Sequence, residues 1–176
     1  KVGDLVKIDD HFGQVMESKL FATRLRTPKN EEVIVPNSIV LNTHVINYST
    51  LASNRGLILH TTVGIGYETP WRQVEGILKL AAERTEGILK DPPAFVLQQQ
   101  LGDFAVNYEL NVYCNDPVNL MKHYTALHQN VLDVFNENNV QIMTPAYEGD
   151  PPEPKVVPKD QWFTPVAGTT NSGKGK

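Results

Sequence analysis

The sequence predicts two consecutive domains, the first all-β and the second α+β, followed by an extended tail. Three observations support this fold class. Residues 1–54 contain short apolar runs between turn residues, residues 55–147 alternate strand and helix patterns, and residues 148–176 contain five prolines. A chain of 176 residues, of which 40% are hydrophobic, is long enough for one domain or two small ones.

The first region, 1–54, predicts five short strands. The runs are β-branched or alternate in polarity, and they end at turn-forming clusters such as Thr27-Pro28-Lys29-Asn30. The expected strands are 5–8, 12–16, 20–26, 32–35 and 43–48. Because so little chain closes its sheet edges best by curling, we expect a small Sm-like barrel or twisted sheet.

The second region, 55–147, opens with a predicted strand and helix. The strand covers 57–65, where β-branched residues alternate with others. Thr69 is the expected N-cap of the helix, and Pro70 occupies its first position. Apolar residues then recur at helical spacing up to Lys90, where Asp91-Pro92-Pro93 ends the pattern.

The rest of this region completes the order βαββαβ. Strands are expected over 94–98 and 104–114, the latter with strict alternation. Asp116-Pro117 repeats the cap-plus-proline pattern before a second helix, and the last strand covers 140–143. This order predicts a ferredoxin-like domain, in which two helices cover one face of a sheet.

The third region, 148–176, is expected to be extended, because its prolines disfavour a helix. Its large apolar pair, Trp162-Phe163, should dock against another part of the protein. The small polar residues at the end of the chain predict disorder there.

Composition excludes several classes of protein. The chain has 16 Lys+Arg and 20 Asp+Glu, a net charge of −4, and the second region holds ten of the acids and six of the bases. This balance disfavours binding to nucleic acid through phosphate contacts. A single cysteine excludes a disulfide framework and a Cys-rich zinc site.

The sequence offers no catalytic, cofactor or metal site. His123 and His128 are five positions apart on one helix and therefore point to different faces. Cys114 continues an apolar face, so we expect a buried thiol. Gly64-Ile65-Gly66 lacks the third glycine of a dinucleotide-binding turn. The chain is predicted to be a binding or assembly part rather than an enzyme.

A series of motifs in the first region is more specific. In order, they are Val2-Gly3-Asp4, Gly13-Gln14-Val15, Thr23 to Asn30, Val33 to Ser38 and Ile46 to Ser49. The ordered set resembles the middle domain of the small-conductance mechanosensitive channel (MscS-like) family. That family carries a βαββαβ region next, so the resemblance covers about residues 1–147.

The resemblance implies a channel of an inner membrane that opens under bilayer tension during osmotic stress. Such channels are usually homoheptamers, and their pore-lining helices would precede Lys1, which is not a methionine; we therefore expect a piece of a longer protein. This piece would form the cytoplasmic vestibule, a cage whose side portals pass ions and small solutes, without a cofactor. Residues 161–166 of the tail would join a small barrel on the symmetry axis.

Five residues of the matching motifs are expected to serve architecture. Gly3 and Gly13 suit tight turns or positive φ where a strand bends. Asp4 suits the acceptance of backbone hydrogen bonds at a strand start. Pro36 and Asn37 suit a rigid turn in which the asparagine bonds its own backbone.

Three loop acids are the expected portal residues, namely Glu68, Asp91 and Asp103. If portals lie where the two domains meet, the net charge of the second region repeats around the ring. A wall of one sign concentrates counter-ions within about 8–10 Å at ordinary salt. We therefore expect a vestibule that mildly enriches cations.

Two alternatives belong to other functional classes. An RNA-binding module would combine an Sm-like barrel with a sheet on which Phe104 and Tyr108 stack bases, and it predicts salt-sensitive binding. A ligand-sensing regulatory module predicts a ligand-dependent rise in melting temperature. Fold alone does not choose among these functions.

Overall fold

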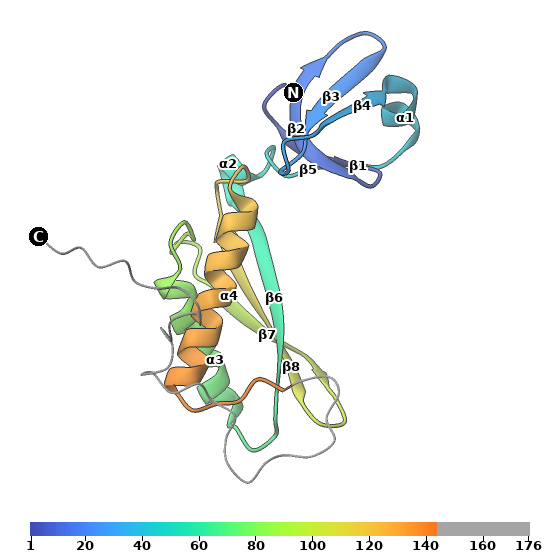
Figure 1. The fold of residues 1–176 in the computed structure, drawn as a ribbon. Helices are drawn as coiled ribbons and strands as arrows, with labels where there is room; N and C mark the ends of the chain where they lie inside the picture. Colours follow the sequence, from blue (N-terminus) through green and yellow to red (C-terminus); the bar gives the residue numbers. More distant parts are fainter. Residues whose placement is uncertain (144–176) are drawn as a thin grey trace, which may run out of the picture.

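The computed structural model describes residues 1–143, which form two separate antiparallel sheets. The first sheet has the strand order β4-β3-β2-β1-β5, and the second has the order β6-β8-β7. Figure 1 shows the first sheet at one end of an elongated second domain. The predicted class, an all-β domain followed by an α+β domain, is confirmed. The predicted tail over 148–176, with its segment 161–166, lies outside the described residues.

The first sheet is built from short strands joined by tight turns. Asp9 and Asn30 adopt positive φ values of 53° and 65° in two of these turns, a conformation that asparagine and aspartate tolerate. Side chains that alternate inward form a small core of Val6, Ile8, Val15, Leu25 and Val35. The strands are β1 (Leu5–Ile8), β2 (His11–Ser18), β3 (Ala22–Arg26), β4 (Glu32–Pro36) and β5 (Val45–Asn47).

Two short helices in and after this sheet were not predicted. They are α1 (Asn37–Asn42), between β4 and β5, and α2 (Ala52–Arg55), before the second domain. Helical periodicity cannot be read from four to six residues, because an apolar stripe needs at least two turns to repeat. Tertiary contacts therefore decide both helices.

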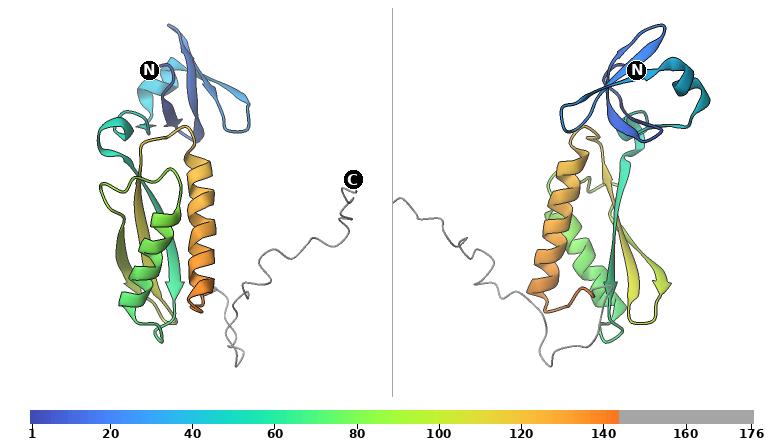
Figure 2. Two further views of the ribbon diagram at one scale, coloured as in Figure 1. Left: turned by 90° about the vertical axis from the view of Figure 1, so that its left-hand side faces the viewer. Right: turned by 45° about the vertical axis from the view of Figure 1, so that its right-hand side comes forward.

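The second domain places two helices on one face of a three-stranded sheet (Figures 1 and 2). β8 is the central strand and pairs with both neighbours. Because the helices cover only one face of this antiparallel sheet, the side chains of β8 alternate between the core and the other face. Its helix-facing residues Leu110, Val112 and Cys114 are fully buried. The elements are β6 (Leu57–Ile65), α3 (Trp71–Arg84), β7 (Phe95–Leu101), β8 (Val106–Cys114) and α4 (Leu120–Glu137).

The predicted last strand, 140–143, is reduced to one bridge. Ile142 pairs antiparallel with Ile65, and the Met143 amide donates to the Gly64 carbonyl at 2.8 Å. This bridge lies on the free edge of β6, the place of the fourth strand in a ferredoxin-like sheet. The strand starts late because the Val140 amide donates to the Phe135 carbonyl and closes the end of α4 instead.

Both helices of the second domain begin later than predicted, and α3 ends earlier. Pro70, not Thr69, is the N-cap residue of α3, and Asn119 rather than Asp116 is that of α4. α3 ends at Arg84, where the Thr85 hydroxyl donates to the Ala81 carbonyl.

Beyond α3, the chain turns back onto the sheet. Gly87 has a positive φ of 80°, and the Leu89 amide donates to the Tyr113 carbonyl at 2.7 Å. Ile88 and Leu89 keep helical spacing in the sequence but pack outside the helix. Ile88 packs against the second core, and Leu89 forms an isolated bridge with Tyr113. Periodicity alone does not distinguish such a segment from a helix.

The two domains share one hydrophobic core at their junction. Leu5 of β1 is buried within the larger core, which belongs mainly to the second domain. Phe12 and Tyr48 pack against the same core and meet edge to face, with ring centroids 5.4 Å apart. The packing therefore couples the first sheet to the second domain.

Among residues 1–143, none of the helices combines the length and apolar character needed to cross a bilayer.

Candidate functional site at the junction of the two domains

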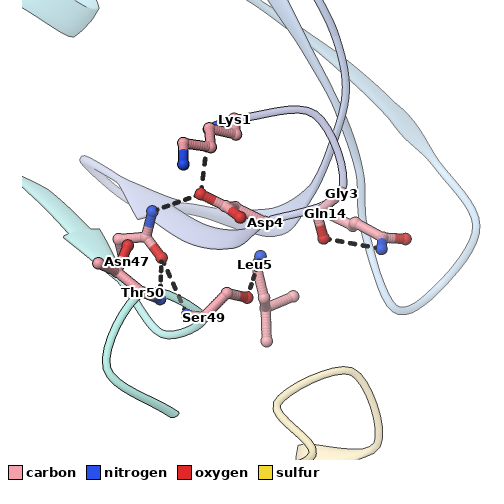
Figure 3. A network of polar contacts seen from close by, with 8 residues as sticks. All are labelled: Lys1, Gly3, Asp4, Leu5, Gln14, Asn47, Ser49 and Thr50. Atoms are coloured by element: carbon pink, nitrogen blue, oxygen red, sulfur yellow. Dashed lines mark hydrogen bonds and ion pairs between the residues drawn. The ribbon is translucent and has the colours of Figure 1, made fainter. Parts of the chain in front are cut away.

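A polar network fastens the start of β1 to the end of β5, directly before the chain enters the second domain (Figure 3). The Asp4 carboxylate accepts a hydrogen bond from the Asn47 side-chain amide at 2.8 Å. The hydrogen bond from Asn47 is the largest cause that lowers the pKa of Asp4 below its ordinary value of 3.8. The Asp4 carboxylate thus accepts from a side chain of β5 rather than from the backbone amides predicted at the strand start.

Asn47 and Ser49 shape the turn on the other side of this network. The Asn47 side-chain oxygen accepts from the backbone amides of Ser49 and Thr50, at 2.9 and 3.0 Å. This is an Asx turn, in which a side chain replaces a backbone acceptor. The Ser49 hydroxyl then accepts from the Leu5 amide at 2.9 Å, so the turn holds β1 directly.

Gly3 takes the positive φ predicted for it, at 92°. Open space surrounds the position where a Cβ would lie, so backbone conformation rather than crowding favours glycine there. The Gly3 carbonyl accepts from the Gln14 side-chain amide at 2.9 Å, and its amide donates to the Val15 carbonyl. Gly3 therefore extends the pairing of β1 with β2.

Gly13 has a different role from the one predicted. It lies inside β2 without a positive φ, and a Cβ there would come within 2.7 Å of the Arg26 carbonyl oxygen. The close approach of the β3 backbone therefore excludes a side chain. The bulge between Val15 and Glu17 follows on the same strand.

Pro36 and Asn37 mark the end of β4, but Asn37 does not bond its own backbone. Its side-chain amide donates to the carbonyls of Lys19 and Leu20, at 2.7 and 2.9 Å. Its side-chain oxygen accepts from the Thr23 hydroxyl at 2.9 Å. Asn37 thus ties α1 to the turn between β2 and β3, a contact between segments that sequence spacing could not reveal.

The three predicted portal acids are all exposed, but only Asp91 lies at the end of the second domain that meets the first. The expected place at the domain junction is therefore wrong for Glu68 and Asp103. Glu68 follows β6 and Asp103 lies in the turn between β7 and β8. Their two loops are joined by the Tyr67 hydroxyl, which donates to the Gly102 carbonyl at 2.6 Å. Asp91 lies at the other end, where it lines a hollow together with Leu51 and Arg55 beside α2.

The aromatic pair required by the RNA-binding alternative does not share a face. Tyr108 points into the core and is 2% exposed, whereas Phe104 lies in the turn before β8 and is 73% exposed. β8 begins at Val106, so Phe104 is not part of the strand. The sheet therefore offers no two-aromatic platform of the predicted kind.

Neither the Cys114 thiol nor the residues of metal-binding type form a candidate reactive or metal site among the described residues. Cys114 is buried, and burial raises the pKa of its thiol. Within residues 1–143, no three His, Cys, Asp or Glu side chains converge as metal ligands would.

Asn47 and Ser49 are the junction residues whose roles the sequence analysis did not assign. Both lie in the motif Ile46 to Ser49 that supports the family resemblance. The available signal was the spacing Asn-x-Ser before a polar turn, which is typical of an Asx turn.

Comparisons with known proteins agree with this geometry. The family described as "Mechanosensitive ion channel, beta-domain" matches residues 1–50, and "Mechanosensitive ion channel MscS, C-terminal" matches residues 59–142. An uncharacterized MscS family protein of Aquifex aeolicus is 28% identical over 151 residues, which is 83% of this chain and 40% of that protein. The small-conductance mechanosensitive channel of Helicobacter pylori is 24% identical over 142 residues, covering 81% of this chain and 51% of the channel.

A solved structure supports the fold. The crystal structure of Helicobacter pylori MscS in its closed state superposes with a TM-score of 0.69 at 22% identity, over 85% of this chain and 58% of that one. The chain thus spans about half, or less, of the length of these relatives. Both domains, in the same order, match consecutive parts of one family. The chain belongs to the MscS family of mechanosensitive ion channels.

Proposed function

We propose that this chain is the cytoplasmic vestibule of a tension-gated ion channel. The observation that carries the proposal is the match of both domains, in order, to the β-domain and C-terminal domain of MscS channels. In this function the chain supports the gate and filters ions and small solutes. It forms part of a homo-oligomeric cage, a heptamer, with side portals, while helices outside this chain cross the inner membrane.

Unpaired sheet edges support assembly into a ring. Within residues 1–143, β4 and β7 each pair with only one strand, so each leaves a row of backbone donors and acceptors free. A repeated head-to-tail contact between different edges of neighbouring copies closes into a ring when its rotation allows. Such a ring would need no further polypeptide to cover these edges.

Liposome patches test the proposal directly. The full-length protein that contains this chain is reconstituted, and current is recorded while suction stretches the patch. We expect conductance that rises with tension and is absent from protein-free patches. Assembled protein that gives no tension-dependent current would contradict the proposal. Chemical cross-linking of the same preparation should give a ladder that ends at seven subunits, and a ladder that ends elsewhere would correct the heptamer alone.

The loop acids carry the proposed ion filter at two levels. Asp91 lies beside α2, near the first domain. Glu68 and Asp103 lie in the two loops joined by the Tyr67–Gly102 bond, and Figure 1 shows the end of β6 and the turn between β7 and β8 at the far end. In a ring, each level repeats its negative charge in every subunit. Because surface charges act only within about a Debye length, the enrichment of cations should be visible at low ionic strength.

Neutralisation of these acids gives a testable prediction. The combined change Glu68→Gln, Asp91→Asn and Asp103→Asn should shift the reversal potential in a salt gradient toward lower cation preference. The shift should fade as ionic strength rises, because salt screens exposed charges. An unchanged reversal potential at low ionic strength would reject the filter.

A matched control removes the same number of charges elsewhere. Glu83, Glu86 and Asp133 are also exposed acids of the second domain, but they lie on or just after its helices. Their combined neutralisation should leave the reversal potential unchanged. An equal shift from this control would show that net charge, rather than the loops, sets the preference.

A further inference from the structure

A crevice of about 500 Å³ separates the first sheet from the start of α4. One wall comes from β2 and the turn between β3 and β4, and the other comes from residues 117–122. Pockets of roughly 300–1,000 Å³ are typical of sites for small organic ligands. The crevice is therefore large enough for such a molecule, and it lies where the two domains pack together.

The charge of the crevice is opposite to that of the protein. Its lining residues include Arg26 and Lys122 but no acid, although the chain carries a net charge of −4. Within residues 1–143, neither of these cations lies within 4.0 Å of a carboxylate: the Arg26 Nε donates to the neutral Asn30 side chain at 2.7 Å. Two unneutralised cations in one hollow favour an anion.

The acids next to the lining residues are engaged by other groups. Glu32, the cross-strand partner of Arg26, pairs with Arg24 at 3.4 Å. The Glu31 carboxylate accepts from the Thr27 hydroxyl at 3.1 Å, and the Asp116 carboxylate accepts from the side-chain amide of Asn119 at 2.7 Å. Asp116 also faces His123 at 3.5 Å. None of these carboxylates lines the crevice, so none neutralises its two cations.

The rest of the lining is apolar or carries neutral hydrogen-bonding groups. Leu5 and Phe12 contribute from the first domain, while Val118 and Met121 contribute from the second and are largely exposed. Gln14 lies on the same wall as Arg26 and adds an amide. A ligand with a charged head and a small apolar group would complement both parts of this surface.

We propose that this crevice binds a small soluble organic anion, a phosphate or carboxylate that carries an apolar group, between Arg26 and Lys122. Because both domains contribute walls, bound ligand would stabilise one arrangement of the first sheet against the second domain. The binding site does not rest on the channel function, because the chain alone contains all of its residues.

Phenyl phosphate is the probe for the test, with inorganic phosphate and phenol as its two halves. Calorimetry on the 176-residue chain should show saturable binding of phenyl phosphate and clearly weaker binding of each half. Amide chemical shifts measured by NMR should move at 26–30 and 117–122. Absence of saturable binding, equal binding of phenol, or shifts elsewhere would overturn the proposal.

Single substitutions then test whether Arg26 and Lys122 are the cations that bind the anion. Arg26→Gln and Lys122→Gln should each weaken phenyl phosphate binding about tenfold, the effect expected of one lost charge-assisted hydrogen bond. Lys90→Gln removes the same charge from an exposed position outside the crevice and should leave binding unchanged. Equal weakening by all three variants would mean general electrostatic attraction and would overturn the site.

A last experiment distinguishes binding of a soluble ligand from binding of a lipid headgroup. The chain is sedimented with vesicles of phosphatidylglycerol and phosphatidylcholine, in the wild-type form and as the Arg26→Gln variant. We expect no cosedimentation that depends on Arg26. Vesicle binding through Arg26, without binding of phenyl phosphate, would overturn the soluble-ligand proposal in favour of a headgroup.

Discussion

At the scale of single residues, one glycine and one asparagine of the first domain act through contacts with a neighbouring segment of the chain. Gly13 keeps β2 close to the backbone of β3, and Asn37 bonds two carbonyls of a neighbouring turn. Neither role depends on a buried side chain. Both roles depend on another strand being at hydrogen-bonding or contact distance, so they are properties of the folded sheet.

Substitution of Gly13 by alanine tests this close approach. The new Cβ would lie 2.7 Å from the Arg26 carbonyl oxygen, so β2 and β3 must separate or shift. We expect the free energy of unfolding to fall by about 1–3 kcal/mol, the range for overpacked sites. Urea denaturation followed by circular dichroism measures the change.

Gly76→Ala is the matched control for this prediction. Gly76 lies inside α3, where no atom comes within 4 Å of the position of a Cβ. Alanine should therefore raise the free energy of unfolding by about 0.5–1 kcal/mol, because it favours a helix more than glycine does. A Gly13→Ala protein as stable as the wild type would show that the strands can separate freely.

At the scale of elements, β1 is held by strands on both sides and by a side-chain network at its start. β1 pairs with β2 and β5. Asp4, Asn47 and Ser49 add bonds at the end of this pairing nearest the second domain. The network therefore fixes the first sheet where the chain leaves it.

Because of this network, the free energy of unfolding of the first domain should depend on pH in the acidic range. The pKa of Asp4 is lowered on folding, so its contribution is present above the unfolded value, near 3.8. It is lost as pH falls through the lower folded pKa. Asp4→Asn should thus reduce the urea midpoint at pH 7, and its difference from the wild type should narrow below about pH 3.8.

Asp10→Asn supplies the comparison for the acid titration. Asp10 is exposed in the turn between β1 and β2 and has no hydrogen-bonding partner on β5. Its variant should follow the wild-type midpoint at every pH. A constant gap between Asp4→Asn and the wild type across the titration would exclude ionisation as the cause.

At the scale of the whole molecule, the two domains unfold together if the shared core governs stability. Leu5 belongs to the first sheet by sequence but is buried in the core of the second domain. Ile8 lies on the same strand, yet it belongs to the small core of the first domain. The two residues therefore separate coupling between domains from stability within one domain.

Leu5→Ala should destabilise both domains, by about 2–5 kcal/mol overall, because it opens a cavity at the junction. Amide hydrogen exchange, resolved by mass spectrometry, should accelerate in both sheets. Ile8→Ala should accelerate exchange mainly in the first sheet. Acceleration confined to the first sheet in Leu5→Ala would contradict a shared core.

The sequence alone predicted an element correctly where its local hydrophobic pattern matches the burial of its side chains in the fold. β8 alternates strictly and is central, and both long helices carry apolar stripes that face the sheet, so their presence and order were predicted. The family resemblance also followed from the sequence, because short motifs kept their order and spacing.

Only the tertiary structure decided which segments meet. Leu89 keeps helical spacing but pairs with Tyr113 of β8. Asn37 bonds the turn between β2 and β3, and Gly13 closely approaches β3. Leu5 packs in a core whose other buried residues lie more than fifty positions later in the sequence. Arg26 and Lys122 line one crevice although they belong to different domains. Local periodicity reports the environment of one segment, whereas these contacts depend on how separate segments pack, and that packing is set by the free energy of the whole fold.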